Sequence, residues 1–383
     1  MLTKANLRLN WWAIELFSEL CLLPVQIDKK SRRIKMETRR WKLVLYFLQL
    51  FIWTFHLIFY VYTFVVEGVI TYTPKKFGHL PCPLLCGMLS FITLYLNYHI
   101  FYKWSDVYFQ IFDSLVLCIP ERTDVRTKHT RQEWLAMVIF PVYMIIPIHH
   151  IGIFVLETSA FYFLYTHVPD QLKGSISMAV CAIIDFYLVF MWTATYVFTL
   201  IWLLIFTNIS CDKLQRQINA LKAEQNVITI RKILIPTIYK ESRQLELMFY
   251  RFNAAASKVV LLVKLCQLIA AVMAFYFGVR IFKVNVAQGL TFLIVALWDA
   301  VMFATLFERA FEFPIKMEDL KQKLRCAAYK CSEKDQLKLI FKQIDSISCI
   351  KVKVGDFVSM EKDSALNYVS TVVLRTVDLL VTF

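Results

Sequence analysis

The chain has 383 residues, of which 58% are hydrophobic and 15% aromatic, and its formal net charge is +14. Seven long apolar stretches leave too little sequence for a soluble catalytic domain, so we expect neither enzyme activity nor a cofactor. A charge of this size in a soluble protein would suggest nucleic acid as a partner. Here the basic residues flank the apolar stretches, which instead indicates a membrane and no nucleic acid.

The seven stretches are each about long enough to cross a hydrocarbon core of ~30 Å as an α-helix. We therefore predict an all-α, polytopic membrane protein with seven transmembrane helices. The predicted spans are residues 43–66, 80–102, 134–156, 176–206, 258–281, 289–307 and 365–383.

The Lys and Arg residues fall almost entirely on one side of these spans. Of the 43 such residues, 36 lie in four segments, 1–42, 103–133, 207–258 and 308–364, and 5 lie in the loops of the other side. Basic loops stay cytoplasmic during insertion, so we predict a cytoplasmic N-terminus and an external C-terminus. The basic segments would also attract the anionic lipid of the inner leaflet.

In the first two-thirds of the chain, we predict two helices outside the spans and an extension of the fourth span. Ahead of Pro24, the spacing of Leu9, Trp12, Leu16, Leu20 and Leu23 predicts an amphipathic helix. The fourth stretch continues into CDKLQRQINALKAEQ without Gly or Pro, so its helix would protrude from the bilayer. Residues 238–257 predict a cytoplasmic helix that leads into the fifth span.

After the sixth span, Pro314 predicts a helix break, followed by amphipathic helices near 316–331 and 333–348. The second has Ser332 as a candidate N-cap and an apolar face made of Leu337, Ile340, Ile344 and Ile347. Such faces need a surface to cover them. A subunit-joining base beneath the membrane would provide one, and the inner leaflet itself is the alternative.

Polar residues occupy one side of the last span, at steps of three and four: Ser364, Tyr368, Thr371, Arg375, Asp378 and Thr382. In one interpretation, Arg375 and Asp378 pair and the stripe packs against the other six helices. In the other, copies of this helix meet on a symmetry axis and line an aqueous pore. A ring of Asp378 would then favour cations, with Val381 or Leu379 as an apolar constriction.

Two short segments carry a resemblance to a known family. Before the first span stands LFSELCLLPV, and the chain ends in RTVDLLVTF. With the inside N-terminus, small external loops and long fourth helix, the chain resembles the insect gustatory and odorant receptor superfamily, more the gustatory branch. That branch ends in Thr-Tyr, five apolar residues and Gln-Phe. This chain keeps the spacing and Phe383, but Arg375, Thr376 and Thr382 replace the Thr, Tyr and Gln, and Asp378 interrupts the apolar run.

The resemblance implies a ligand-gated, non-selective cation channel in the plasma membrane of a sensory dendrite. It implies a tetramer, homomeric or formed with related receptors, in which the seventh helices surround the pore and cytoplasmic helices join the subunits. A small-molecule tastant would bind in the outer half of the bundle. We therefore expect a six-helix bundle over 1–307, a cytoplasmic anchor over 308–364 and a pore helix over 365–383. The expected pore residues are Thr371, Arg375, Asp378, Val381 and Thr382.

Intramembrane carboxylates are costly and mark candidate ligand sites. Asp185 and Asp299 both fall near the predicted midplane. They could bind the hydroxyls of a sugar-like ligand or the ammonium of an alkaloid-like one against aromatic walls. Alternatively, each is bonded to a Ser, Tyr or His of a neighbouring helix and serves packing. The predicted ligand-binding residues are Asp185, Tyr187, His150, Tyr276, Trp298 and Asp299.

Two other classes compete, a G-protein-coupled-type receptor and a small-molecule transporter. The first predicts the opposite orientation and an Asn-Pro-x-x-Tyr motif in the seventh span, which this sequence lacks. The second typically shows internal repeats or paired broken helices, and we find neither. An intramembrane aspartyl protease would carry Tyr-Asp and Gly-x-Gly-Asp, whereas Asp185 stands in Ile-Asp-Phe and Asp299 in Trp-Asp-Ala.

Overall fold

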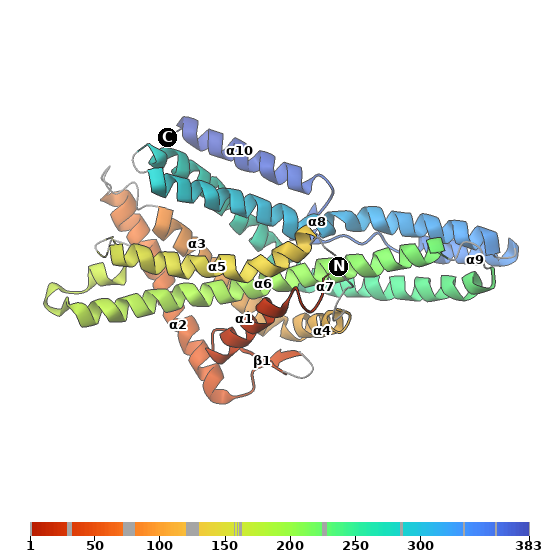
Figure 1. Cartoon of the computed structure of the whole chain (residues 1–383), viewed down its shortest axis with the longest axis horizontal. Coiled ribbons are helices and arrows are strands. Elements are labelled where there is room, and N and C mark those ends of the chain that lie inside the picture. The colour runs from red at the N-terminus through yellow and green to blue at the C-terminus, as the bar shows by residue number, and fades with distance from the viewer. Residues whose placement is uncertain are drawn as a thin grey trace.

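A computed structural model describes most of the chain, and helices dominate it (Figure 1). Among the described residues, seven helices are long and apolar enough to cross a membrane, which confirms the predicted fold class. The described residues are 2–28, 33–71, 81–119, 130–156, 158, 160, 163–223, 228–283, 286–331, 334–356 and 358–382.

Each predicted span corresponds to one long helix. The seven are α2 (Arg40–Thr63), α3 (Pro81–Asn97), α5 (Arg131–Leu156), α6 (Ser175–Ala223), α7 (Ile228–Phe282), α8 (Val286–Cys331) and α10 (Ser364–Thr382). Turns of π-helix extend α2 over Phe64–Ile70 and α3 over Tyr98–Lys103. Two 3₁₀ turns, Leu164–His167 and Asp170–Leu172, lie in the loop between α5 and α6.

Shorter elements complete the fold. The helices are α1 (Arg8–Glu19), α4 (Ser105–Val116) and α9 (Lys334–Asp345). Strands β1 (Val25–Ile27) and β2 (Ile34–Met36) form an antiparallel pair with Val25 opposite Met36. Strands β3 (Lys353–Val354) and β4 (Val358–Ser359) form another, with Lys353 opposite Ser359.

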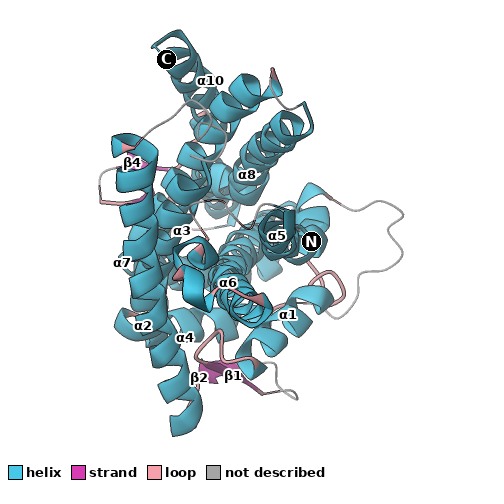
Figure 2. Cartoon of the chain, turned by 90° about the vertical axis from the view of Figure 1, so that its left-hand side faces the viewer, coloured by secondary structure: helices cyan, strands magenta, loops and turns pink. Residues whose placement is uncertain are grey.

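Helix α6 is the centre of the bundle. It packs against α1, α3, α4, α5, α7 and α8, which lie around it in Figure 2. In its apolar window, 94% of the residues are buried, against 17% in α10. A helix that is covered on every side must be apolar on every side. In α6, for example, the aromatic ring of Trp202 packs on Tyr108, Phe206 and Phe252. Helix α10, by contrast, lies at the edge of the bundle.

Helices α7 and α8 approach each other closely at the end where they are joined. A Cβ atom added at Gly289 would lie 2.5 Å from Cα of Phe282, closer than two carbon atoms can come. Only Gly fits at this position, as is usual where membrane helices meet backbone to backbone.

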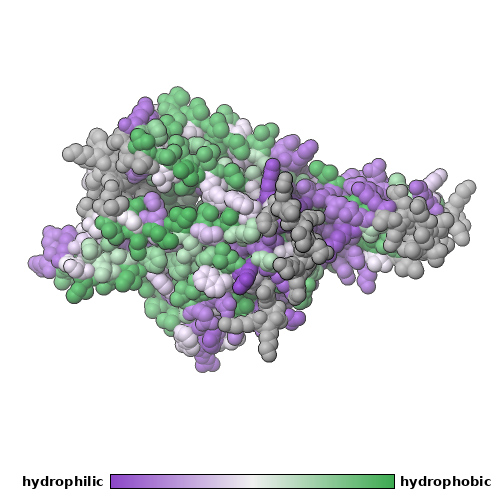
Figure 3. All heavy atoms as spheres, viewed as in Figure 1, coloured by the Kyte–Doolittle hydropathy of each residue, from purple (hydrophilic) through white to green (hydrophobic). Residues whose placement is uncertain are grey.

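Three helices continue far beyond the apolar block. One end of each of α6, α7 and α8 projects beyond the block at the right of Figure 1, and α9 packs back on α8. Polar residues gather over this projection, and apolar residues over the block from which it leaves (Figure 3). The structure thus confirms the protruding fourth helix. It also confirms a helix over 238–257, which is continuous with the fifth span in α7.

The predicted break at Pro314 was wrong, because α8 runs through it from Val286 to Cys331. Proline removes one backbone hydrogen bond, and in an exposed helix that loss commonly ends or kinks the helix. Here Phe313 and Met317 are fully buried, and α8 packs along both α6 and α7. Tertiary packing therefore holds the helix together across the proline. The second predicted helix is confirmed as α9, and Ser332 lies outside the described residues.

Helix α1 forms where it was predicted, but it buries a different side. Asn10, Ala13 and Phe17 face the bundle, and the Asn10 side chain donates a hydrogen bond to the Ala136 carbonyl. On the predicted apolar side, Leu9, Trp12 and Leu20 are exposed and Leu16 is half-buried, whereas Leu23, beyond the end of α1, is buried. The apolar spacing therefore identified the helix and not the face that packs.

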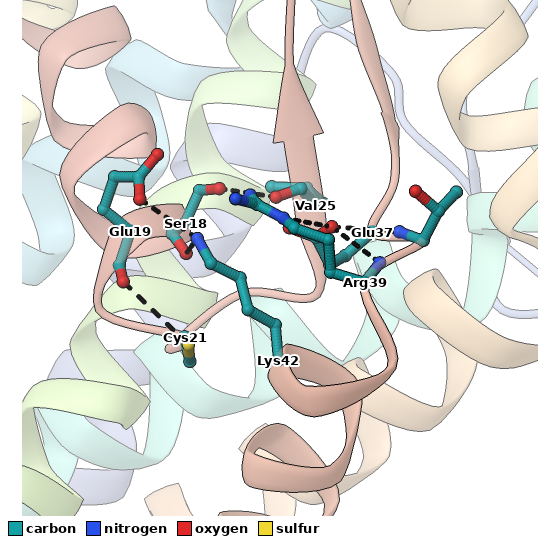
Figure 4. Close-up of polar contacts among 8 residues, drawn as sticks. Ser18, Glu19, Cys21, Val25, Glu37, Arg39 and Lys42 are labelled. Atoms are coloured by element: carbon teal, nitrogen blue, oxygen red, sulfur yellow. Dashed lines mark hydrogen bonds and ion pairs between the residues drawn. The ribbon is translucent and has the colours of Figure 1, made fainter.

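A network of charged residues ties this N-terminal region to the start of α2 (Figure 4). The Lys42 ammonium is buried and donates to the Ser18 carbonyl at 3.3 Å and to the Glu19 carboxylate at 3.0 Å. The Glu37 carboxylate accepts two bonds from the Arg39 guanidinium, at 3.0 and 2.8 Å. It also accepts the backbone N–H groups of Thr38 and Arg39. These bonds, above all the one from the Arg39 side chain, lower the pKa of Glu37 to about 2.

Candidate functional site

The last helix turns one side toward the bundle and a polar side away from it. Tyr368, Val372 and Thr376, spaced four residues apart, are buried where α10 packs on α7 and α8. The Arg375 and Asp378 side chains are 70% and 60% exposed, and they form an ion pair of 3.2 Å with each other. Of the other predicted pore residues, Val381 and Thr382 are exposed and Thr371 is half-buried.

This arrangement agrees with one part of the packing interpretation of the stripe and disagrees with another. The pair between Arg375 and Asp378 forms, as the packing interpretation required. Of the stripe, however, only Tyr368 is buried against the other helices of its own chain. Facing lipid, each of these two charges would cost roughly 2.5–3.5 kcal/mol near the bilayer centre. The polar side of α10 therefore calls for water or another protein surface.

A first group of buried polar residues, the outer cluster, consists of His56 on α2, His150 on α5 and Asp185 on α6. His56 Nε2 lies 3.1 Å from Asp185 Oδ1, and both side chains are buried. His150 is close enough to interact electrostatically with both residues. Within the described part of the chain, Asp185 Oδ2 and His150 Nε2 have no hydrogen-bond partner.

A second group, the central cluster, joins four helices. It consists of Tyr143 on α5, Gln267 on α7, Trp298 and Asp299 on α8, and Tyr368 on α10. Tyr143 lies near Gln267, Trp298 and Asp299, and Tyr368 lies near Asp299. Both tyrosine hydroxyls, the Trp298 indole N–H and both amide atoms of Gln267 are buried without a hydrogen-bond partner among the described residues. Such a concentration of unpaired buried groups is unusual in a folded protein.

Through Tyr368, the central cluster includes a residue of the last helix, α10. The Tyr368 ring stacks on Phe303 of α8, with centroids 4.0 Å apart and planes 17° apart. Tyr368 is also the residue of the polar stripe that α10 buries most deeply. A change around Asp299 can therefore reach α10 through a single side chain.

The six predicted ligand residues do not form one site. Trp298 and Asp299 belong to the central cluster, and His150 and Asp185 to the outer cluster. Tyr276 packs beside Phe277 with Leu379 and Leu380 of α10. The Tyr187 hydroxyl donates to the Leu20 carbonyl at 3.2 Å, which places it beside the N-terminal segment.

Sequence reasoning missed three residues of the two clusters altogether: His56, Tyr143 and Gln267. It placed a fourth, Tyr368, in the polar stripe of the last span and not among the ligand residues. The available signal was a polar group inside an apolar span, which is costly unless it is paired or functional. His149 illustrates the limit of that signal, because it is exposed while the adjacent His150 is buried.

The described residues offer no obvious place for a metal ion. No group of three or more His, Cys, Asp or Glu side chains among them is arranged to hold one. The side chain of Cys82, which the sequence places one helical turn from Cys86, is outside the described part of the chain.

Seven helices long enough to span a membrane, three of them extended into a common projection, and a peripheral last helix make up this fold. The structure is similar to olfactory receptor OR5 from Machilis hrabei (TM-score 0.69), aligned over 98% of this chain and 99% of that one. It is also similar to the same receptor in complex with eugenol (TM-score 0.63), over 99% of each chain. Sequence identity is 10% in both alignments.

These similarities confirm the predicted fold. At 10% identity they say nothing about this chain's own ligand. No protein-family model matches the sequence, and no curated protein is significantly similar to it.

Proposed function

We propose that the protein is a chemosensory receptor of the insect gustatory and odorant receptor superfamily, on the gustatory branch, and that it acts as a ligand-gated, non-selective cation channel. The similarity in fold supports the channel class. The observation that carries the proposal is the polar side of α10, where Arg375 and Asp378 lie exposed on a helix long enough to span the membrane.

Four copies of α10 around a symmetry axis would give this side a wet surface, because the polar stripes would then face one another across a pore. Thr371, Arg375, Asp378 and Thr382 would line it. The ion pair reduces the charge of each Asp378, so the ring would attract cations only weakly, in keeping with a non-selective channel. Val381, which is 82% exposed, would form the apolar constriction.

The cytoplasmic projection would join the subunits. The expected anchor over 308–364 contains the end of α8, all of α9 and the β3–β4 pair. The cytoplasmic halves of α6 and α7 lie alongside it, so the anchor we propose includes them as well. It would form a homotetramer or a heterotetramer with related receptors.

We assign the ligand to the central cluster, because it is the one of the two clusters that contacts α10. A small tastant bound beside Asp299 and Trp298 would alter the environment of Tyr368 and thus the position of the last helix. The ligand must bind the open state more tightly than the closed state if it is to open the channel. The outer cluster, held together by the contact between His56 and Asp185, would then serve mainly to hold α2 against α6.

Whole-cell recording in a heterologous cell, with G-protein signalling blocked, tests the proposal. A panel of tastants should evoke an inward current that rises without the delay of a second-messenger cascade. Surface labelling of the same cells is the necessary control. A panel that evokes no current from a receptor shown to be at the surface would contradict the channel assignment.

A further inference from the structure

Asp299 has no partner of opposite charge. Among the described residues it makes neither a hydrogen bond nor an ion pair, and no basic side chain acts on it. The ionisable groups that face it are Tyr143, Tyr196, Cys266 and Tyr368, from α5, α6, α7 and α10, and none of them is basic. A carboxylate inside a membrane span is costly without a counter-ion, and the described residues supply none at this place.

Asp185 is different in this respect. Its Oδ1 lies 3.1 Å from His56 Nε2, so a group that can carry a positive charge already faces it. Both carboxylates lie inside spans, yet only Asp299 lacks such a group among the described residues.

Three tyrosines, Tyr143, Tyr196 and Tyr368, lie close enough to the Asp299 carboxylate to interact with it electrostatically. Tyr143 packs against Tyr196 with ring centroids 5.4 Å apart, and Tyr196 stacks on Trp192 at 5.8 Å. Trp298 and Tyr368 belong to the same cluster. Aromatic rings near a carboxylate are the chemistry that recognises organic ammonium groups, because ring faces carry negative potential and the carboxylate supplies the countercharge.

The unpaired hydrogen-bonding groups add a second requirement. The Trp298 N–H and the Gln267 amide N–H group are donors without a hydrogen bond to a described residue, although the Tyr143 hydroxyl lies near both, so an acceptor atom on a ligand would satisfy them. Asp299 and the Gln267 carbonyl are acceptors, which suits the N–H groups of an ammonium. A neutral polyol could satisfy the hydrogen bonds but would leave the charge of Asp299 without a counter-ion.

We propose that the central cluster binds a small organic amine in its cationic form, with the ammonium on Asp299 and a hydroxyl or ether oxygen of the same molecule facing Trp298 and Gln267. This inference rests on the proposed function only in that the amine would be the ligand that opens the channel. Binding itself can be measured without any current.

The experiment measures binding to the purified, full-length protein in lipid nanodiscs, followed by the fluorescence of its tryptophans and by thermal melting. The probes are primary amines of increasing size, each paired with the alcohol that carries a hydroxyl in place of the ammonium. The pairs are ethanolamine with ethylene glycol, phenethylamine with phenethyl alcohol, and tyramine with tyrosol. Glucose represents the neutral polyols.

At least one amine should bind about tenfold or more tightly than its paired alcohol, because it alone gains a charge-assisted interaction with the Asp299 carboxylate. The preference should disappear in Asp299→Asn and persist in Asp299→Glu, which keeps the charge. The matched control is Asp170→Asn, since Asp170 lies exposed in the loop before α6 and pairs with Lys173. This variant should keep the full preference.

The wild-type comparison needs no variant and can overturn the proposal alone. Alcohols that bind as tightly as their amines, glucose binding in preference to the amines, or no saturable binding by any amine would each do so. So would a preference that survives in Asp299→Asn. Amine binding without any current would contradict the channel function and leave this inference intact. If only neutral ligands open the channel and no amine binds, the channel function would stand and this inference would be contradicted.

Discussion

Glu37 shows how a single ionisable residue can fix the entry of the chain into its first span. Its side chain is only 2% exposed and its carboxylate is bonded to Arg39 on two sides. Since a carboxylate in an unfolded chain has a pKa of about 4.3, the folded value near 2 means that folding favours the charged form. The stabilisation is complete above the unfolded pKa and disappears as the pH falls through the folded one.

We predict that Glu37→Gln lowers the free energy of unfolding by about 1–2 kcal/mol at pH 7, because charge-assisted hydrogen bonds are lost from a buried group. The loss of stability should be small because the Arg39 side chain is partly exposed, so solvent screens its interaction with Glu37. Thermal melting of both proteins between pH 3 and pH 7 measures it, and the difference should shrink as the pH falls below about 4.

The control for this prediction is Glu361→Gln. Glu361 also pairs with a basic residue, Lys351, but both side chains are exposed, so solvent screens the pair and the variant should melt like the wild type. A constant difference between wild type and Glu37→Gln across the pH range would contradict the assigned role of the ionised carboxylate.

Asp185 and Asp299 look alike in the sequence, as single acidic residues near the middle of apolar spans. In the structure the first faces His56 and the second faces aromatic rings. The packing alternative therefore suits Asp185, and the ligand alternative suits Asp299. The partner of each carboxylate comes from a helix far away in the chain, so no local pattern could distinguish them.

At the scale of elements, α10 differs most from the helices around it. It buries only Tyr368, Val372 and Thr376, and the other residues of the helix are exposed or half-buried. The polar stripe was predictable from the spacing of its residues. Which neighbour the stripe meets was not, because that depends on how α10 rotates about its own axis when it packs on α7 and α8.

We predict that Asp378→Asn lowers the permeability of the channel to Ca²⁺ relative to Na⁺, because the ring loses its negative charge while Arg375 stays. The interaction of two unit charges about 4 Å apart in water is about 1 kcal/mol, which corresponds to a change of about fivefold. Reversal potentials in solutions of the two ions measure the ratio.

Two further variants check that the effect comes from charge in the pore. Asp378→Glu should behave like the wild type, and Arg375→Gln should raise the Ca²⁺ permeability by freeing Asp378 from its ion pair. An unchanged ratio in both Asp378→Asn and Arg375→Gln would remove the pair from the pore wall.

At the scale of the whole molecule, the proposed orientation places the projection of α6, α7 and α8 in the cytoplasm. The C-terminus lies at the end of the bundle away from that projection (Figure 1). A G-protein-coupled-type receptor would have the opposite orientation.

We predict that, in intact cells, antibodies stain an epitope added after Phe383 and not one added before Met1, because basic segments remain cytoplasmic during insertion. Permeabilised cells should stain for both epitopes, which controls for expression. Staining of the N-terminal epitope in intact cells would contradict the orientation and, with it, the outward position of Val381 and Thr382.

The sequence by itself determined the number of spans, the protrusion of the fourth helix and the polar stripe of the last one. Hydrophobic length, charge asymmetry and helical spacing are local properties, and they can be read from neighbouring residues. Only the tertiary structure decided that α8 continues through Pro314, which face of α1 is buried and that Tyr368 lies beside Asp299. These outcomes depend on contacts between helices that are distant in the chain, and their packing energies outweigh the local preferences.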